Sequence, residues 1–535
     1  MTRSYRRLPV VLTAGLVSVA LLAACSSGSS PVAVDVAASG VDALAPEVVE
    51  APAVAPAPVH PPVLDAPAAA ARHAAGVSVT AVRGVGAPAA LAASRALFTS
   101  ASTVVVAPSS DRAARESAAS ASARLGVPVL LSGPGVAAAQ LEAEARRLGA
   151  VRVVAVGNAP QLAGLTTVAL APGGDVHELA AIGGVRPAAP AGVVALVGDG
   201  PLPATALASV RASGVPIVHV VNGDPRATAG SVKAIAAAGP SHVITFGVGF
   251  GSAKTVASRV ASASTGVQLP GGGQLIFPTG KGVRGKRYVA LYGTPGSKAL
   301  GVLGEQSVPK TIARATRTAA KYKSLTKSKV VPMVEIIATI ASAEAGKDGN
   351  YSRERSVAEL KPLVDAARKK GLAVVLDLQP GRTDFLTQAK RYSSLLALPN
   401  VGLALDPEWR LKKDQVHLKQ IGSVKIAEVN KTADWLAAFT RQHKLPQKLL
   451  VLHQFSLKMI VGRSKLKTSH DELALLIHVD GQGTQPAKLA TWKALRSNAP
   501  KVHWGWKNFI DEDKPMLSAT KTYKIKPKPD LVTYQ

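Results

Sequence analysis

The stretch VGLALDPEWR, residues 401–410, contains two carboxylates separated by a single residue. An apolar run typical of a buried strand ends there in Asp406, Pro407, Glu408 and Trp409. In an extended chain, residues i and i+2 point to the same side, so both acids would face one way. Like charges held together raise one pKa, so one carboxyl can donate a proton while the other acts as nucleophile, base or charge stabiliser. Cleavage of a glycosidic bond needs this division of roles.

The C-terminal half contains the elements that would position these acids. Strand-like apolar runs alternate with helical stretches over about 250 residues, which predicts a (β/α)8 barrel, a TIM-like fold, over 287–535. The eight runs are RYVALYG, VVPMVEIIATIA, LAVVLDLQPG, VGLALDPEW, SVKIAEVN, KLLVLHQF, LALLIHVDGQG and VHWGWKNF. A doubly wound sheet is the alternative, but polar residues close nearly every run, and this favours the barrel.

In such a barrel the C-terminal ends of the strands converge on one pocket. The polar residues at these ends are Tyr292, Glu335, Asp377 with Gln379, Asp406 with Glu408, Glu428, His453 with Gln454, His478 with Asp480, and Trp506 with Lys507. Buried carboxylates need partners or shifted pKa values. Acids and amides that bind hydroxyls, beside planar rings that stack on sugars, predict a site for a polyhydroxylated ligand. We expect Asp406 and Glu408 to be catalytic and the others, Glu428 aside, to bind substrate.

Other chemistries have weaker signatures. Asp377, His453, His478 and Asp480 could form a metal-dependent hydrolase site, but the sequence has no His-x-His at the first strand and no His-Glu-x-x-His. A Gly-x-Ser-x-Gly elbow for a serine nucleophile is also absent. We therefore expect neither a metal nor another cofactor.

The region from residue 77 to 280 has a different composition. It is rich in Ala and Gly, it has no Trp, and Lys233 and Lys254 are its only lysines, whereas all five tryptophans follow later. This shift places a domain boundary near 270–287. Short β-branched runs alternate with Ala-rich helical stretches, which predicts a parallel sheet covered on both faces. Matching runs recur at a regular spacing, so we expect a duplicated doubly wound α/β domain.

The N-terminal residues predict an export signal followed by a tether. Arg3, Arg6 and Arg7 precede an apolar run, Leu8 to Ala24, which is short for a membrane span and is typical of a secretory signal over 1–24. Cys25 is the only cysteine, so no internal disulfide can form. Residues 25–76 are mostly Ser, Pro, Ala and Val and cannot build a core, which predicts an extended tether.

Four resemblances add expectations. Leu22-Ala23-Ala24-Cys25 resembles a bacterial lipobox, which implies cleavage before Cys25, acylation of its thiol and attachment to the extracytoplasmic face of the cell membrane. A plain secretory signal or an uncleaved anchor is the alternative. VVVAPSSDRAARESAASASARLGVPVLLSGPG followed by VRVVAVGN resembles the putative cell-wall-binding repeats of Gram-positive surface proteins, which implies adhesion to a wall polymer. The family's opening motif is degraded near Arg83, and a generic doubly wound domain is the alternative.

The third and fourth resemblances concern the barrel. Asp406-Pro407-Glu408 is similar to the Asp-x-Glu at the fourth strand of some barrel lysozymes and chitinase-like hydrolases. This similarity implies that Glu408 donates the proton and that Asp406 steadies a reacting N-acetyl group. ALDPEWR, LPQKLLVLHQF, VDGQG and KPDLVTYQ resemble an uncharacterised family of secreted and lipid-anchored actinobacterial proteins, which implies the barrel but no activity.

Charge narrows the range of partners. The formal net charge is +29 and the pI is near 10.2, which predicts attraction to anionic lipid headgroups or acidic wall polymers. The sequence has no zinc-finger spacing, phosphate loop or nucleic-acid module, so we expect no nucleic-acid partner. We expect a surface lipoprotein that binds wall polysaccharide or peptidoglycan, with a barrel that binds and could hydrolyse a glycan. The alternatives are a wall-binding protein with a non-catalytic barrel, and a lipoprotein that captures a small solute.

Overall fold

The computed structural model describes residues 76–182, 190–200 and 204–535. The predicted signal, Cys25 and the tether before residue 76 lie outside the described residues. Residues 72–535 form one compact unit. Within the described part of the chain, no helix has both the length and the apolar character needed to cross a membrane.

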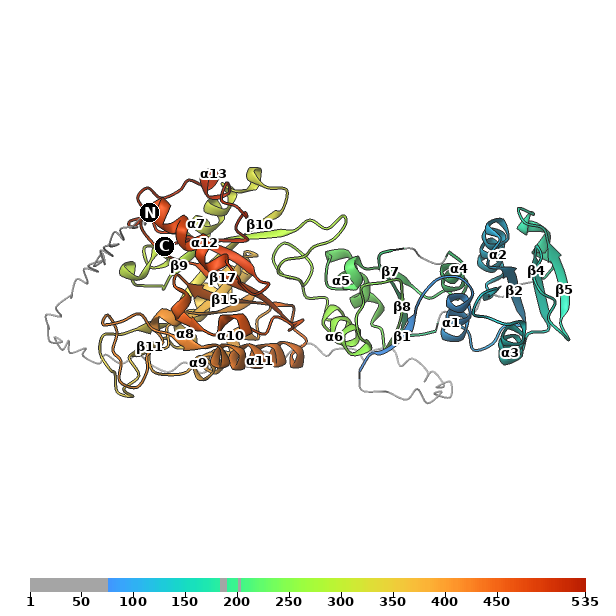
Figure 1. Cartoon of the computed structure of the whole chain (residues 1–535), viewed down its shortest axis with the longest axis horizontal. Coiled ribbons are helices and arrows are strands. Elements are labelled where there is room, and N and C mark those ends of the chain that lie inside the picture. Colours follow the sequence, from blue (N-terminus) through green and yellow to red (C-terminus); the bar gives the residue numbers. More distant parts are fainter. Residues whose placement is uncertain (1–75, 183–189, 201–203) are drawn as a thin grey trace, which may run out of the picture. The chain divides into compact units, whose positions relative to one another are not determined.

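The region from residue 76 to 263 contains two four-stranded sheets, and all strand pairs in both are parallel (Figure 1). The first sheet has the order β3-β2-β4-β5, and the second has the order β1-β8-β6-β7. The strands are β1 (Ser78–Val82), β2 (Thr103–Pro108), β3 (Val129–Ser132), β4 (Arg152–Val156), β5 (Thr166–Leu170), β6 (Val193–Val197), β7 (Ile217–His219) and β8 (His242–Phe246).

The two sheets are copies of one βα arrangement. The starts of β2 and β6 are 90 positions apart (103 to 193), those of β3 and β7 are 88 apart (129 to 217), and those of β4 and β8 are 90 apart (152 to 242). The copies differ in the strand beside β4 and β8. In the first sheet this strand is β5, which follows β4 in the chain, whereas in the second it is β1, which precedes every other element. The predicted duplication is therefore present, with the second sheet completed by the N-terminal strand.

Helices rich in Ala pack between and beside these strands. They are α1 (Ala87–Leu97), α2 (Arg112–Leu125), α3 (Ala138–Leu148), α4 (Ala204–Ala212), α5 (Ala229–Ala238) and α6 (Ala253–Ala263). Asp111 caps α2 by accepting a hydrogen bond from the Ala114 backbone NH at 3.0 Å, and Gly126 ends the helix in a left-handed conformation. The small buried faces of these helices, such as Ala114, Ala118 and Ala121 in α2, allow close packing.

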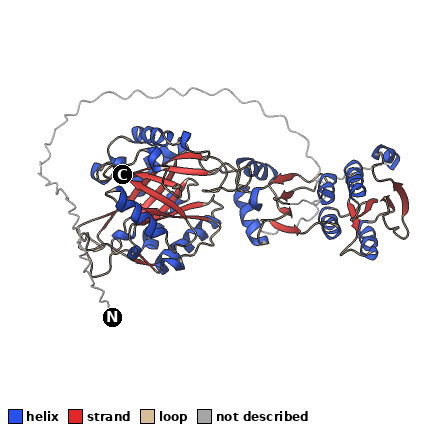
Figure 2. Ribbon diagram, turned by 45° about the horizontal axis from the view of Figure 1, so that its top comes forward, coloured by secondary structure: helices blue, strands red, loops and turns tan. Residues whose placement is uncertain are grey.

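The C-terminal region is a closed barrel of eight parallel strands (Figures 1 and 2). The strand order is β9-β10-β12-β13-β15-β17-β18-β19, and β19 pairs with β9 to close it. The strands are β9 (Lys286–Gly293), β10 (Lys329–Ala341), β12 (Ala373–Leu378), β13 (Val401–Leu405), β15 (Lys448–Gln454), β17 (Leu473–Val479), β18 (His503–Asn508) and β19 (Leu531–Tyr534). The predicted fold class, a duplicated α/β domain followed by a (β/α)8 barrel, is confirmed.

One of the eight predicted strands is wrong. SVKIAEVN forms the short strand β14 (Val424–Lys425), which pairs outside the barrel with β16 (Ile460–Val461), and then enters α11 (Ile426–Gln442). The apolar pattern continues past this run at helical spacing, because the buried residues of α11 include Val429, Ala433, Leu436 and Thr440. The eighth strand is instead β19, from the ending KPDLVTYQ.

Alternation along the strands separates two packing layers. Val289 and Leu291 of β9 point outward into a core shared with the surrounding helices, whereas Tyr288 and Ala290 point inward. Figure 2 shows these helices around the red strands. The helices are α7 (Val308–Ala320), α8 (Val357–Lys369), α9 (Phe385–Arg391), α10 (Ser393–Leu396), α11, α12 (Gln485–Arg496) and α13 (Ala519–Thr522).

Residues before the first barrel strand close the barrel floor. Leu269 and Ile276 belong to the inward-facing cluster together with Met333 and Val375. The Tyr288 hydroxyl donates to the Ile276 carbonyl oxygen at 3.0 Å. The residues around the composition boundary therefore belong to the barrel core and close its N-terminal end.

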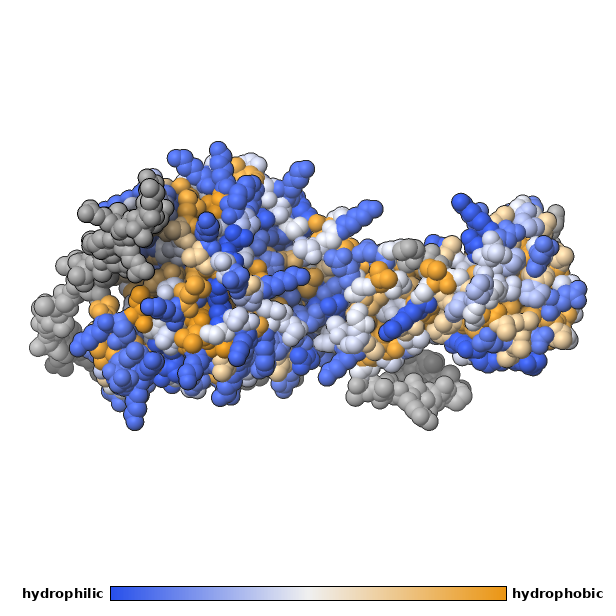
Figure 3. Space-filling view, in the orientation of Figure 1, coloured by the Kyte–Doolittle hydropathy of each residue, from blue (hydrophilic) through white to orange (hydrophobic). Residues whose placement is uncertain are grey.

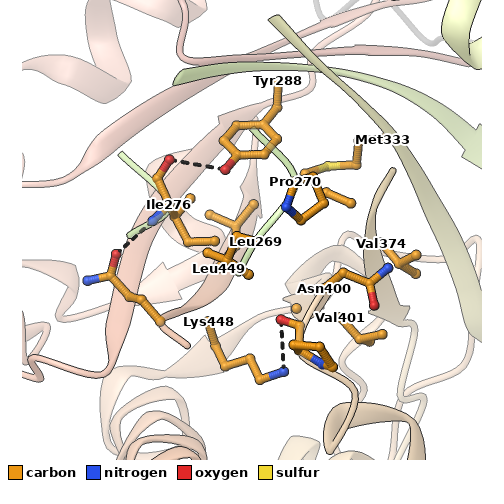
Figure 4. Close-up of a pocket in the computed structure, with 14 residues that line it drawn as sticks. Leu269, Pro270, Ile276, Tyr288, Met333, Val374, Asn400, Val401, Lys448 and Leu449 are labelled. Carbon is orange, nitrogen blue, oxygen red and sulfur yellow. Dashed lines mark hydrogen bonds between the residues drawn. The ribbon is translucent and has the colours of Figure 1, made fainter. Parts of the chain in front are cut away.

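Lys448, the first residue of β15, lies buried at this floor. Figure 4 shows its side chain along the edge of a cavity whose opposite side is formed by Tyr288 and Met333. Its ammonium group donates to the carbonyl oxygens of Leu398 at 2.5 Å and Pro399 at 3.5 Å, and it pairs with no carboxylate of the described residues. The side chain is 1% exposed. Burial lowers the pKa of Lys448 to about 7.

Lys448→Met should raise the free energy of unfolding by about 1–3 kcal/mol at pH 6, since each pKa unit of depression corresponds to about 1.4 kcal/mol and the lost hydrogen bond cancels part of the gain. The folded pKa lies below the unfolded value, so wild-type stability rises between pH 7 and the unfolded pKa. The gain should therefore shrink at pH 9. Urea unfolding at both pH values tests this, with exposed Lys369→Met as the control. A variant less stable than wild type at pH 6 would contradict it.

Candidate functional site

Polar side chains from all eight strands meet inside the barrel at the C-terminal ends of the strands. Strand alternation places each of them on the inner face, and the pairs Tyr292–Glu335, His453–His478 and Lys507–Thr533 are direct neighbours across adjacent strands. All are at most 7% exposed. We call this set the mouth layer; it comprises Tyr292, Glu335, Asp377, Asp406, His453, His478, Asp480, Lys507 and Thr533.

His453 is the centre of the mouth layer. Its Nε2 lies 2.8 Å from Glu335 Oε1, and its Nδ1 lies 2.9 Å from Asp480 Oδ2. Burial opposes a charge on the ring, but the Glu335 and Asp377 carboxylates raise the pKa of His453 well above its ordinary value. Burial raises the pKa values of Glu335 and Asp480, and His453 reverses this and lowers both. The arrangement is a buried imidazolium held between two carboxylates.

Thr533 connects this group to a second histidine. Its hydroxyl donates to Glu335 Oε2 at 3.1 Å and lies 2.8 Å from His478 Nε2. Because the hydroxyl proton goes to Glu335, His478 must donate from Nε2, and its Nδ1 has no hydrogen-bond partner among the described residues. Burial, reinforced by the charge on His453, lowers the pKa of His478 well below its ordinary value. His478 is therefore the neutral histidine of the pair.

Tyr292 and Asp377 form the opposite side of the layer. The Tyr292 hydroxyl donates to Asp377 Oδ2 at 2.7 Å and accepts from Gln379 Nε2 at 3.3 Å. The Lys507 ammonium lies 3.8 Å from the centre of the Tyr292 ring. Burial, opposed by His453 and reinforced by Glu335, raises the pKa of Asp377. Its Oδ1 has no hydrogen-bond partner in the described part of the chain.

Asp406 and Glu408 are joined by a tight turn instead of an extended strand. Pro407 cannot donate to a strand ladder, and Pro407–Trp409 forms a 3₁₀ turn directly after β13. The turn is held by the Gly422 NH, which donates to the Glu408 carbonyl oxygen at 2.7 Å, and a Cβ at Gly422 would lie 2.4 Å from that oxygen. The side-by-side extended geometry expected for the two acids is therefore not what the chain adopts.

The pKa values of both acids are nevertheless raised, and the charge of Glu408 contributes to the shift of Asp406. Asp406 is 1% exposed, and burial followed by the charges of Glu408 and Asp377 raises its pKa well above its ordinary value. Glu408 is partly exposed, and burial followed by the charge of Asp480 raises its pKa to about 7. No hydrogen bond or ion pair of the Glu408 carboxyl is found among the residues that the structure describes. Glu408 is thus a carboxyl at the mouth that is half protonated near neutral pH.

Three predicted strand-end residues do not join the mouth layer. Trp506 points outward, where it packs with Trp492 and Ile525. The Gln454 Oε1 accepts from Arg463 at 2.8 Å. Glu428 is in α11 and pairs with Arg410 at 2.9 Å. Of the remaining predicted residues, Gln379 contacts Tyr292, and the rest lie in the layer or at its edge. Thr533 was not predicted, although alternation along LVTY would have placed it inward.

The side chains of the mouth layer are not arranged as metal ligands. Across residues 76–182, 190–200 and 204–535, no group of three or more His, Cys, Asp or Glu side chains is arranged to hold one. Both nitrogens of His453 are already engaged with carboxylates, so neither lone pair is free for coordination.

The fold and the site define a parallel (β/α)8 barrel with a charged layer at its C-terminal mouth. No protein-family model matches the chain, and no curated protein matches it. Among solved structures, Cwp6 from Clostridium difficile is similar with 12% identity and a TM-score of 0.27, covering 58% of this chain and 65% of that one. The chain thus spans just under two thirds of the Cwp6 structure.

A second solved structure is the xylanase and alpha-amylase inhibitor protein XAIP-II from Scadoxus multiflorus, with 14% identity and a TM-score of 0.28, covering 47% of this chain and 93% of that one. At these TM-scores neither structure indicates what this chain binds or does.

Proposed function

We propose that the barrel binds a cell-envelope glycan at its C-terminal mouth and cleaves a glycosidic bond, with Glu408 as the proton donor. One observation carries this proposal: Glu408 is a partly exposed carboxyl that has no hydrogen-bond or ion-pair partner among the described residues, and its pKa is about 7. General acid catalysis needs a group that is protonated near the working pH and is accessible to the leaving oxygen. Glu408 meets both requirements.

The charge that accompanies such an acid is supplied by Asp480. Its pKa is lowered, so it is ionised, and its charge is the second cause of the raised pKa of Glu408. Its Oδ2 is held by His453, whereas its Oδ1 has no hydrogen-bond partner among the described residues. An ionised carboxylate near the acid would stabilise the positive charge that develops on the sugar as the leaving oxygen takes the proton of Glu408. Water would then form the new bond to the anomeric carbon and return a proton to Glu408. Asp406, whose ionisation is strongly disfavoured, would bind the substrate as a neutral hydrogen-bond donor, and the charge left on Glu408 after proton transfer would keep Asp406 protonated.

The rest of the chain fits a protein of the cell surface. We infer that the α/β domain, residues 77–280, adheres to an anionic wall polymer and that an acylated Cys25 holds the chain at the membrane. Support comes from the lipobox-like residues 22–25, the wall-binding-like motifs and the formal charge of +29.

A barrel that binds glycans without cleaving them is the second candidate. The burial of both carboxyls near Glu408 favours it, because Asp480 is 7% and Asp406 is 1% exposed, and a glycosidase needs two carboxyls within reach of the substrate. In that case the mouth layer would be a rigid base beneath a binding surface, and Glu408 would bind a sugar hydroxyl.

Hydrolysis should decline at alkaline pH if Glu408 is the acid. We expect residues 72–535 to release reducing ends from peptidoglycan or wall polysaccharide at pH 6, with a rate that falls about tenfold per pH unit above 7 as Glu408 loses its proton. Binding of the same polysaccharide, measured by pull-down at each pH, is the control and should change much less. A rate that rises between pH 7 and 8.5 would contradict the role of Glu408. Binding without release at any pH would support the second candidate.

A further inference from the structure

Exposed apolar side chains of the barrel region gather at one end of the barrel. Seven large apolar residues between 287 and 535 are exposed, and six of them lie in segments that follow the C-terminal ends of barrel strands. These six are Leu418, Ile421, Leu457, Val461, Ile510 and Met516, and the seventh is Leu489 on α12. Single exposed apolar residues are normal on a protein surface, but a group at one end indicates a binding surface.

Two of these segments form one continuous surface. Residues 411–425 follow β13 and residues 455–468 follow β15, and the parallel pair β14–β16 joins them. Ile421 and Leu457 each lie three positions before the paired residues Val424 and Ile460. The first segment is also fixed to the mouth, because the Ser423 NH donates to the Arg410 carbonyl oxygen at 3.1 Å. We call residues 411–425 and 455–468 the rim surface.

The rim surface combines apolar and cationic side chains. Leu418, Ile421, Leu457 and Val461 are 58%, 56%, 53% and 54% exposed. The exposed lysines of the same two segments that could face lipid phosphates are Lys412, Lys413, Lys419, Lys425, Lys458 and Lys465, whereas Lys467 is paired with Asp434 at 2.7 Å. Asp414 is the only acidic residue in either segment. Figure 3 shows hydrophobic residues, in orange, at the surface of the barrel region among hydrophilic ones.

We propose that the rim surface binds an anionic lipid bilayer, with the aliphatic side chains entering the headgroup region and the lysines facing lipid phosphates. Exposed aliphatic residues surrounded by lysines provide both contributions to peripheral membrane binding, which are apolar burial and attraction to negative surface charge. A second copy of the chain would place the same lysines opposite each other, so charge complementarity favours the bilayer. The proposal does not depend on hydrolysis, because Glu408 is not part of the rim surface.

The test is co-sedimentation of residues 72–535 with vesicles, which leaves out the apolar run 8–24. Wild type should bind phosphatidylglycerol vesicles at least tenfold more tightly than phosphatidylcholine vesicles, and binding should weaken with salt. Ile421→Ser with Leu457→Ser, and separately Lys412→Glu with Lys413→Glu, should each weaken binding to the anionic vesicles at least tenfold. The matched controls lie elsewhere on the barrel: Leu489→Ser, and the exposed pair Lys369→Glu with Lys370→Glu.

Equal binding to both kinds of vesicle, or rim variants that bind like wild type, would overturn the proposal. A dimer in sedimentation velocity that is lost in the Ile421→Ser, Leu457→Ser variant would also overturn it, because the surface would then belong to a second copy. Glu408→Gln should bind vesicles like wild type, so a failure of the proposed hydrolysis would leave this result unchanged.

Discussion

Glu408→Gln should reduce the release of reducing ends from the susceptible glycan by about 10²–10⁴-fold, the usual contribution of a general acid. The amide has nearly the shape of the protonated carboxyl but cannot give up a proton to the leaving oxygen. Because the Glu408 carboxyl makes no hydrogen bond or ion pair with the described residues, the substitution removes none that holds the fold. Glycan binding, measured by pull-down, should stay within a few-fold of wild type. Glu512→Gln, at an exposed position beyond β18, is the matched control.

Glu408→Gln should also change how the free energy of unfolding depends on pH. The folded pKa of Glu408, about 7, lies above the value of about 4.3 for an unfolded chain. The folded state therefore binds more protons between these values, and wild type loses stability as the pH rises through 7. Glu408→Gln lacks this loss and should be more stable than wild type at pH 8.5 by about 1–2 kcal/mol after allowance for its partial exposure. Equal hydrolysis by both proteins would refute the catalytic role, whatever their stabilities.

His453→Ala should have the largest effect on stability. The substitution leaves Glu335 and Asp480 buried without the cation between them, and removal of one partner from a buried ion pair costs about 3–5 kcal/mol. The carboxyls would then be held neutral, with folded pKa values raised above the unfolded ones. The variant should therefore be less defective at pH 5 than at pH 8, since protonation is available at the lower pH.

Urea unfolding at pH 5 and pH 8 measures this effect. His443→Ala, at the exposed C-terminal end of α11, is the control and should change stability little at either pH. A His453→Ala variant as stable as wild type at pH 8 would mean that the imidazole is not a buried cation.

Much of the mouth layer could be predicted because each member follows an apolar run. Tyr292, Asp377, His453 and His478 each precede the last residue of a strand whose earlier residues are mostly apolar, and parallel strands bring such ends together. Glu335 lies within β10, opposite Tyr292. The same alternation explains the errors. A residue next to an inward-facing one must point outward, so Gln454 beside His453 and Trp506 beside Lys507 could not share the layer.

Other features depended on tertiary contacts that the sequence does not show. LVTY is short and lies at the end of the printed chain, and only the closure between β18 and β9 makes it a strand. The bend at Pro407 is held by the Gly422 NH, which donates to the Glu408 carbonyl oxygen from a position 14 residues further along the chain. The pKa of His453 is raised and that of His478 is lowered, and these opposite shifts depend on which buried carboxylates lie near each ring. The carboxylates come from β10, β12 and the segment after β17, so the sequence alone does not show them together.

The protonation state of Glu408 is the most direct test of the account. Infrared difference spectra between wild type and Glu408→Gln, recorded from pH 5 to 9, isolate the carbonyl stretch of its protonated carboxyl. The account predicts a band that is present at pH 5 and disappears with a midpoint near pH 7. A band already lost by pH 5 would show an ordinary surface carboxylate and would contradict Glu408 as a proton donor.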